Sequence, residues 1–220
     1  MSIKDNLLRI KSQLPENVTL VAVSKTKPFS DLMEAYNAGQ RVFGENKIQE
    51  MTEKWEQMPK DIQWHMIGHV QTNKVKYMAE YVSLIHGVDS LKLLQEINKQ
   101  AAKHNRIIDC LLQMYIAEEE TKFGLDEKEL EDILQFVQND KLQNIKVVGL
   151  MGMATFTDNQ TQIKKEFLNL KSTFDKINSL SIVNYQLSII SMGMSGDYNL
   201  AIECGSTMVR IGSSIFGNRK

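Results

Sequence analysis

Eight short runs rich in β-branched and aliphatic residues alternate with segments of helical periodicity along this chain. Strands regularly followed by helices predict a parallel sheet joined by crossover helices. Eight consecutive units favour a closed barrel over an open doubly wound sheet, which usually has fewer strands. The expected strands are 18–24, 41–44, 62–67, 82–86, 107–116, 146–151, 186–190 and 207–211. The expected helices between them are 30–38, 47–57, 72–78, 90–104, 127–138, 159–178 and 197–203.

The length and composition agree with one core. The chain has 220 residues, of which 42% are hydrophobic, and this is enough for a single domain over residues 1–220. An amphipathic segment over residues 1–14 adds a helix before the first strand. We therefore expect an α/β fold, a single (β/α)8 TIM barrel with an extra N-terminal helix. In such barrels the functional residues follow the carboxyl ends of the strands.

Charge and residue content argue against several classes of protein. The formal net charge is −1, so nothing indicates binding to nucleic acid or to an anionic membrane surface. No run approaches transmembrane length, and the N-terminus lacks a signal-peptide core. Cys110 and Cys204 are too few for a disulfide framework or zinc cluster. His65 and His69 have the spacing of a zinc pair but lie across an expected strand end, so we expect no metal. These features predict a cytoplasmic protein.

A lysine follows the first expected strand directly. The apolar run that ends at Val23 leads into Ser24-Lys25-Thr26-Lys27 and then a proline. A lysine amine must lose its proton to attack a carbonyl, and a partly apolar wall or a nearby cation lowers its pKa. Lys27 is a candidate for that cation. Lys25 is therefore either a Schiff-base lysine or a solvated lysine at the end of a strand.

Two glycine- and serine-rich segments follow the seventh expected strand and the eighth. They are Ser191–Asp197 after the seventh, and Gly212–Ser214 at the exit of the eighth within the block Gly205–Ser214. Glycine allows backbone N–H groups to approach an anion, and serine adds hydroxyl donors. Each segment alone is ordinary turn chemistry, but the loops after strands seven and eight are where TIM barrels bind phosphate.

Arg210 lies inside the apolar eighth strand, between Val209 and Ile211. A barrel-interior arginine needs a partner because an unpaired buried charge is costly. Two alternatives remain open from the residues alone. Arg210 pairs with a structural carboxylate, for which Glu203 is a candidate, or it faces the ring of a ligand.

Six blocks of this sequence together resemble the pyridoxal phosphate homeostasis protein family, also called the proline synthetase co-transcribed family. The resemblance covers essentially the whole chain, in order and at the expected spacing. The blocks are Val23-Ser24-Lys25-Thr26-Lys27-Pro28, Phe43-Gly44-Glu45-Asn46, Trp64-His65-Met66-Ile67-Gly68, Gly149-Leu150-Met151-Gly152-Met153, Ser191-Met192-Gly193-Met194-Ser195 and Gly205-Ser206-Thr207-Met208-Val209-Arg210-Ile211-Gly212.

The resemblance implies the barrel of the alanine racemase N-terminal domain without the second, β domain of that enzyme. It implies pyridoxal 5′-phosphate as cofactor, held as a Schiff base on Lys25. The phosphate-binding residues that it implies are Ser195, Gly212 and Ser213, with contributions from Ser191 and Thr207.

The remaining implied residues concern the cofactor ring and its release. Arg210 would face the pyridine nitrogen, and Asn46 and His65 would line the ring. Lys27 and Lys122 would be secondary acceptors of the cofactor or aids to its release. Lys122 otherwise is a solvated loop lysine.

Three functions are compatible with these residues. The first is a non-catalytic binder that stores, buffers or delivers pyridoxal 5′-phosphate within the cell, with apo-enzymes as possible recipients. The second is an amino-acid racemase or related enzyme with weak activity. Racemisation needs a base on each face of the substrate, and Tyr198 is the nearest tyrosine to the expected site. The third is a barrel that binds a sugar phosphate. We favour the first, as a monomer with no catalytic residue, because the second domain that pairs racemase subunits is missing.

Overall fold

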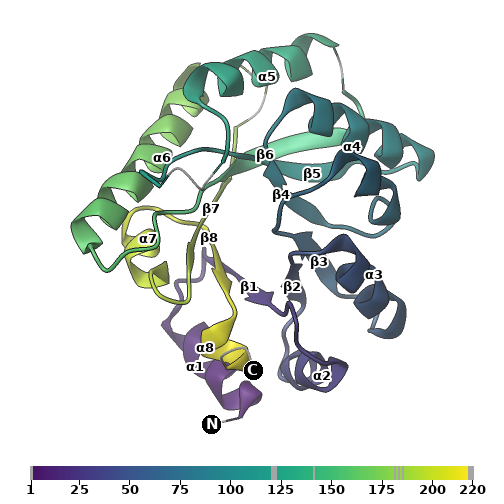
Figure 1. Ribbon diagram of the computed structural model, residues 1–220, viewed down its shortest axis with the longest axis vertical. Coiled ribbons are helices and arrows are strands. Elements are labelled where there is room, and N and C mark those ends of the chain that lie inside the picture. Colours follow the sequence, from purple (N-terminus) through teal and green to yellow (C-terminus); the bar gives the residue numbers. More distant parts are fainter. Residues whose placement is uncertain are drawn as a thin grey trace.

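The parallel barrel predicted from the sequence is present in the computed structural model, which describes residues 2–119, 123–140, 142–180, 182, 184 and 186–217. Strands β1 to β8 pair in chain order, all parallel, and β8 closes the barrel onto β1 (Figure 1). The strands are β1 (Thr19–Val23), β2 (Val42–Glu45), β3 (Gln63–Met66), β4 (Leu84–Val88), β5 (Ile108–Gln113), β6 (Ile145–Met151), β7 (Ile189–Met194) and β8 (Met208–Ile211).

Helices cover the outside of the barrel (Figure 1). They are α1 (Ile3–Gln13), α2 (Phe29–Asn37), α3 (Ile48–Gln57), α4 (Leu91–Lys103), α5 (Glu127–Asp140), α6 (Gln160–Leu180), α7 (Tyr198–Glu203) and α8 (Ser213–Phe216), with the 3₁₀ helix η1 (Thr72–Tyr77). Within the described part of the chain, no helix combines the length and the apolar character needed to span a membrane.

Four expected elements differ from the structure. The seventh strand was expected over 186–190 but is Ile189–Met194, so the segment 191–194 is strand and not loop. The fourth strand, β4, begins two residues later than expected, and the segment after β3 is a 3₁₀ turn rather than an α-helix. The fifth strand ends at Gln113 because Met114 leaves the main ladder for an isolated bridge with Leu125.

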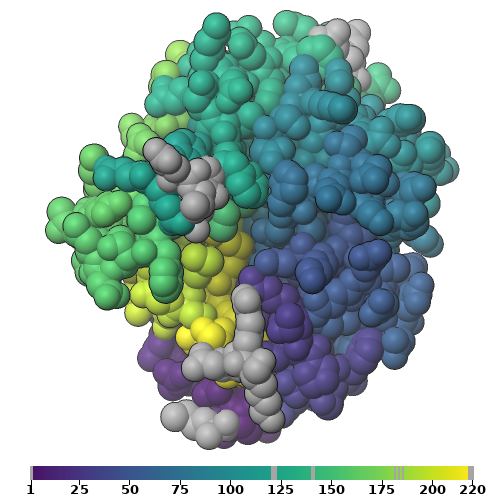
Figure 2. Space-filling view, viewed as in Figure 1, coloured from purple at the N-terminus to yellow at the C-terminus, as the bar shows by residue number. Residues whose placement is uncertain are grey.

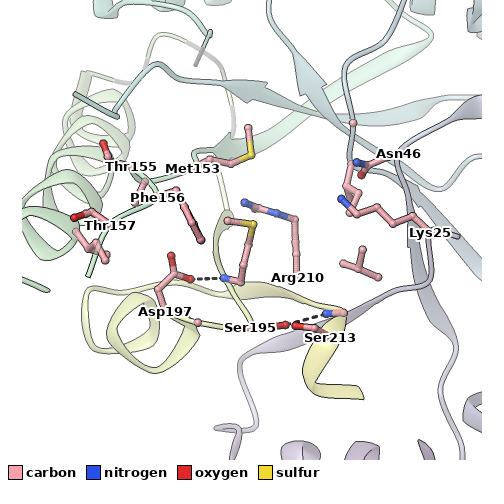
Figure 3. A pocket seen from close by; sticks show the side chains of 18 of the residues that line it. Lys25, Asn46, Met153, Thr155, Phe156, Thr157, Ser195, Asp197, Arg210 and Ser213 are labelled. Carbon is pink, nitrogen blue, oxygen red and sulfur yellow. Dashed lines mark hydrogen bonds between the residues drawn. The ribbon is translucent and has the colours of Figure 1, made fainter. Parts of the chain in front are cut away.

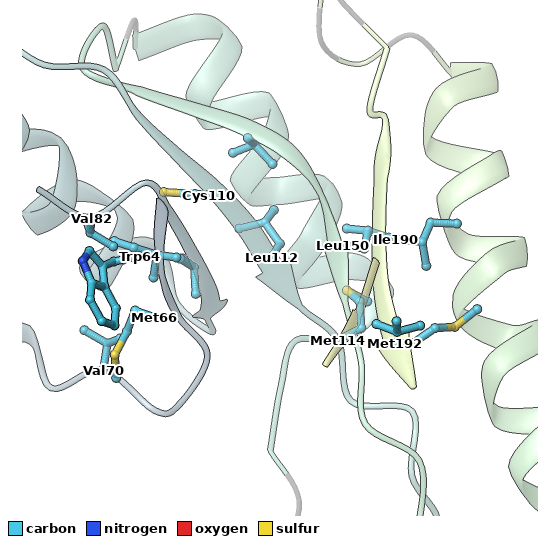
Figure 4. Packing of buried hydrophobic residues seen from close by; sticks show 14 of the residues in the cluster. Trp64, Met66, Val70, Val82, Cys110, Leu112, Met114, Leu150, Ile190 and Met192 are labelled. Carbon is cyan, nitrogen blue, oxygen red and sulfur yellow. The ribbon is translucent and has the colours of Figure 1, made fainter. Parts of the chain in front are cut away.

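Apolar packing falls into two separate layers because side chains alternate across each strand. The larger layer lies between the barrel and the helices, and Figure 4 shows part of it around Trp64, Leu112 and Ile190. Cys110 is fully buried in it, as expected. The smaller cluster fills the barrel interior and consists of Val21, Leu84, Leu111, Val148, Met151 and Met208. This interior cluster forms the floor beneath the functional site.

The expected N-terminal helix packs beside the last helix of the barrel. A capping box begins α1, in which Ser2 and Asp5 bond reciprocally to each other's backbone. The Asn6 side-chain amide donates to the carbonyl oxygen of Ile215 in α8 (3.1 Å). Figure 2 shows the first and last segments, purple and yellow, next to each other on one face. The first and the last helix therefore pack against each other on the outside of the barrel.

Candidate binding site at the carboxyl ends of the strands

A cavity of about 790 Å³ opens at the carboxyl ends of the strands. It lies where functional residues of parallel barrels are found. Its walls come from the ends of β1, β2, β3, β5, β6, β7 and β8 and from the loops that follow them. Six of the residues predicted from the sequence line it: Lys25, Asn46, Ser195, Arg210, Gly212 and Ser213. Three predicted residues do not, namely His65, Ser191 and Thr207.

Lys25 leaves the end of β1 and extends into the cavity. Figure 3 shows its side chain reaching toward Asn46 and Arg210, with Ser195 and Ser213 below them. Lys27 lines the same cavity, and its ammonium group donates to the carbonyl oxygen of Phe216 (2.8 Å). The structure therefore brings the nucleophile candidate and the expected second cation to one site.

Asn46 follows β2, and its backbone packs closely against the backbone of Gly68, which follows β3. A Cβ atom at Gly68 would lie 2.5 Å from the carbonyl oxygen of Asn46. Only glycine allows this approach without a shift of the backbone. Gly68 thus allows the loop after β3 to pack directly on Asn46.

The loops after β7 and β8 meet at the hydroxyl group of Ser195. Its Oγ accepts hydrogen bonds from the N–H groups of Gly212 (3.2 Å) and Ser214 (3.5 Å). The turn after β7 is closed by Asp197, whose carboxylate accepts from the N–H of Met194. Converging backbone N–H groups with neighbouring hydroxyls are the donors that bind phosphate.

Arg210 lies in the inner wall of the cavity and is 4% exposed. Its Nη1 donates to Ser191 Oγ (2.6 Å) and to the Ser191 carbonyl oxygen (2.8 Å), while Nη2 donates to the Gly152 carbonyl oxygen (3.0 Å). The partners of Arg210 are thus neutral oxygens, and not the carboxylate of Glu203 that was one of the two alternatives. Burial lowers the pKa of Arg210 to about 10, so the group is charged at neutral pH.

A chain of buried polar side chains continues from Arg210 into the barrel. Ser191 Oγ lies 3.0 Å from His86 Nδ1, and His86 Nε2 lies 3.0 Å from His65 Nδ1. In the arrangement that gives the Ser191 proton a partner in this chain, Ser191 donates to His86 and His86 donates to His65. This chain forms a polar layer between the apolar floor and the cavity.

The positions of Ser191 and His65 in this polar layer differ from the roles predicted for them. Ser191 is fully buried in β7 and bonded to Arg210, so it does not reach a phosphate in the cavity. His65 points into the barrel, is bonded to His86 and does not line a ring in the cavity. The error for Ser191 comes from the register of β7, which extends four residues beyond its expected end.

The predicted contribution of Thr207 to phosphate binding is also wrong, for a different reason. It immediately precedes β8 and therefore lies at the amino end of the barrel, opposite the cavity. Its Oγ1 accepts from the N–H of Ile190 (2.9 Å) and donates to the carbonyl oxygen of Ser188 (3.5 Å). Through these two hydrogen bonds Thr207 connects the beginning of β7 to the beginning of β8.

The two buried histidines predict a loss of stability in acid. Burial lowers the pKa of His65 to about 3 and also lowers the pKa of His86 well below the usual 6.5. Below pH 6.5 the unfolded chain therefore binds protons that the folded protein does not. We expect the free energy of unfolding to fall by about 2.7 kcal/mol between pH 7.5 and 5.5 from these two groups.

Urea unfolding across this pH range would measure the effect. His86→Gln should remove about half of the pH dependence, whereas His104→Gln, at the exposed end of α4, should leave it intact. An equal slope in His86→Gln and the wild type would contradict the assignment to the buried pair.

The segment after β6 supplies a further wall of the cavity, none of whose residues was among the predicted binding residues. Its lining residues are Met153, Ala154, Thr155, Phe156, Thr157 and Asp158. The buried carboxylate of Glu166 holds this segment by accepting from the N–H (2.7 Å) and the hydroxyl (2.7 Å) of Thr155. Phe156 is 94% exposed at the rim. The Gly-Leu-Met-Gly-Met block was the available signal for this wall. Lys122 lies outside the described residues.

The histidine pair considered for a metal is split by the structure. His65 faces the barrel interior, whereas His69 is exposed and lies 3.2 Å from the carboxylate of Asp89. In the described ranges, no group of three or more histidine, cysteine, aspartate or glutamate residues is placed to hold a metal ion.

A closed parallel barrel with a lysine after its first strand and converging N–H groups after its last two defines a (β/α)8 barrel with a candidate phosphate-binding end. The family model for the alanine racemase N-terminal domain matches residues 1–220. Alanine racemase from E. faecalis shares the fold at 16% identity, with a TM-score of 0.75 over 99% of this chain and 58% of that chain.

More similar proteins narrow the class. The chain is 40% identical to the pyridoxal phosphate homeostasis protein of Aquifex aeolicus, over 91% of this chain and 87% of that protein. It is 39% identical to the protein of the same name from Schizosaccharomyces pombe, over 96% of this chain and 90% of that protein. PipY of Synechococcus elongatus, solved with PLP bound, has a TM-score of 0.91 at 33% identity over 98% of this chain and 100% of that chain. This chain belongs to the pyridoxal phosphate homeostasis protein family.

Proposed function

We propose that this protein binds pyridoxal 5′-phosphate on Lys25 and takes part in the intracellular homeostasis of that cofactor, by storing, buffering or delivering it. The observation that carries the proposal is the convergence of Lys25, the Ser195–Gly212 cradle and Arg210 on one cavity. The names of the relatives and the cofactor in PipY support it.

The donor set of the cavity fits this cofactor. A phosphate needs several N–H and O–H donors, and the two loops supply the backbone of Gly212 and Ser214 with the hydroxyls of Ser195 and Ser213. A Cβ at Gly212 would lie 3.1 Å from the carbonyl oxygen of Val23, so a side chain there would crowd the end of β1 beside Lys25. An aldehyde needs a nearby primary amine, which Lys25 supplies.

Lys25 would form the covalent link. Its Nζ would hold the cofactor by bonding to the aldehyde carbon, with loss of the aldehyde oxygen as water.

Arg210 would face the pyridine nitrogen. Three of its five N–H donors bond to Ser191 and Gly152, which leaves two that no described residue accepts. An arginine donates and does not release its proton at neutral pH, so the ring nitrogen stays an unprotonated acceptor. The cofactor bound in this way supplies a weaker electron sink than one paired with a carboxylate.

A binding role is favoured over racemase activity. Racemisation needs a second base facing the cofactor. Among the residues that the structure describes, no tyrosine lines the cavity, and the hydroxyl of Tyr198 donates to Gln13 in α1 instead (3.4 Å). We propose that the protein acts as one barrel domain, as a monomer in the cytoplasm, with apo-enzymes as possible recipients.

The proposal is tested on the purified wild-type protein with added pyridoxal 5′-phosphate. We expect a visible absorption band that borohydride removes, and mass spectrometry of the digested protein should place the reduced adduct on Lys25. An adduct on Lys27 would show that Lys27, and not Lys25, is the lysine that bonds to the cofactor. A protein that stays colourless would overturn the function.

A further inference from the structure

A buried ammonium group lies behind the segment that carries Lys25. Lys54 of α3 is 4% exposed, and its Nζ donates to Glu45 Oε1 (2.7 Å), Glu50 Oε1 (2.7 Å) and the carbonyl oxygen of Ser24 (2.8 Å). An ammonium has three N–H donors, so these bonds use all of them. One of the three goes to the backbone immediately before Lys25.

The same ion pair also binds the backbone immediately after Lys25. The N–H of Thr26 donates to Glu50 Oε1 (2.6 Å), the oxygen that accepts from Lys54. The Ser24 carbonyl belongs to the peptide group before Lys25, and the Thr26 N–H belongs to the peptide group after it. Both peptide planes that flank the Lys25 Cα are therefore fixed by one pair on α3.

The backbone held in this way is one that its sequence disfavours. Residues 24–27 form a turn in which the N–H of Lys27 donates to the Ser24 carbonyl oxygen (3.1 Å). Thr26, the third residue of this turn, has a φ of +63°, where glycine is usual and a β-branched side chain is strained. The Ser24 hydroxyl also donates to Glu45 Oε1 (2.6 Å). The turn depends on these external bonds.

We propose that the Lys54–Glu50 ion pair, supported by Glu45, is a positioning device that aims the Lys25 amine into the cavity. This inference rests on the proposed function, because it assigns to the pair the placement of the Schiff-base nucleophile. Fixing both peptide planes sets the direction of the Lys25 Cα–Cβ bond and reduces the freedom lost when the amine bonds to a ligand. The pair is therefore expected to affect ligands that bond to Lys25 and not ligands that only occupy the cavity.

Two ligands distinguish an effect on bonding to Lys25 from an effect on occupation of the cavity. Pyridoxal 5′-phosphate carries the aldehyde, whereas pyridoxine 5′-phosphate carries an alcohol in its place and cannot bond to the amine. The variants are Glu50→Ala, which removes the acceptor for Thr26, and Glu50→Gln, which retains an oxygen acceptor. Lys54→Met is a poor test because it would leave two carboxylates without their cation. The control is Asp175→Ala, which breaks the exposed Lys171–Asp175 pair on α6.

We expect Glu50→Ala to weaken binding of pyridoxal 5′-phosphate about 10-fold and to change binding of pyridoxine 5′-phosphate less than about 2-fold. Glu50→Gln should restore most of the loss, and Asp175→Ala should match the wild type. Hydrogen exchange in the ligand-free protein should show the Thr26 amide exchanging at least about 10-fold faster in Glu50→Ala.

The outcomes distinguish the two proposals. Equal losses for both ligands would mean a general structural role and would overturn the positioning role, as would unchanged binding of the aldehyde. An unchanged exchange rate of the Thr26 amide would also overturn it. If the wild type bound neither ligand, the proposed function would fail, and the exchange measurement alone would then decide whether the pair holds the turn.

Discussion

Replacement of Lys25 by alanine is expected to abolish the visible absorption band of the protein with pyridoxal 5′-phosphate while the barrel remains folded. In the proposed function the amine at this position would supply the covalent link, and the change leaves untouched the loops after β7 and β8 that would hold the phosphate. Residual binding through the phosphate should be at least about 100-fold weaker, equal to about 2.8 kcal/mol. Absorption titration and thermal unfolding would measure both quantities.

A matched control is Lys47→Ala, since Lys47 is exposed before α3 and does not line the cavity. It should keep the band and the affinity of the wild type. A band that persists in Lys25→Ala would show that another amine holds the cofactor, and Lys27 would be the first to examine by peptide mapping.

Replacement of Arg210 by glutamate is expected to cost about 3–5 kcal/mol of folding stability at pH 8. The new carboxylate would be buried against the carbonyl oxygens of Ser191 and Gly152, which the arginine now satisfies. Binding of the cofactor should weaken as well, because an acceptor would then face the pyridine nitrogen. Urea unfolding with a parallel absorption titration would measure the two effects.

Arg210→Gln separates charge from hydrogen bonding at this position. The amide is neutral and can still donate to Ser191, so the loss of stability should be about 1–3 kcal/mol. The folded Gln variant should bind the cofactor with an altered absorption spectrum. An unchanged spectrum and affinity in this variant would assign Arg210 a structural role only.

The barrel and most of the cavity were predictable because parallel barrels place strand exits at one end. Lys25 and Gly212 follow strongly β-forming runs whose ends the sequence marks clearly. Ser191 was misplaced because the Ser-Met-Gly-Met segment of β7 lacks strand-forming residues, so the end of that strand could not be located from the sequence. Thr207 was misplaced because it precedes β8 and does not follow it.

Contacts between distant parts of the sequence could not be predicted. His86 meets Ser191 across 105 positions of the sequence, and no local pattern distinguishes it from a histidine in any apolar strand. Lys54 has the spacing of an exposed helix lysine paired with Glu50. Only the packing of α3 against the end of β1 shows that its ammonium is buried.

The order of the strands has a consequence for synthesis of the protein. The lysine comes from β1, the first strand made, while the cradle comes from β7 and β8, the last two, and β8 closes the barrel by pairing with β1. A nascent chain on the ribosome therefore carries the Lys25 amine for nearly the whole of translation without the loops that would hold a phosphate beside it. In the proposed function, binding of the cofactor must follow emergence of β8. Binding is then a late event that occurs only once the barrel is complete.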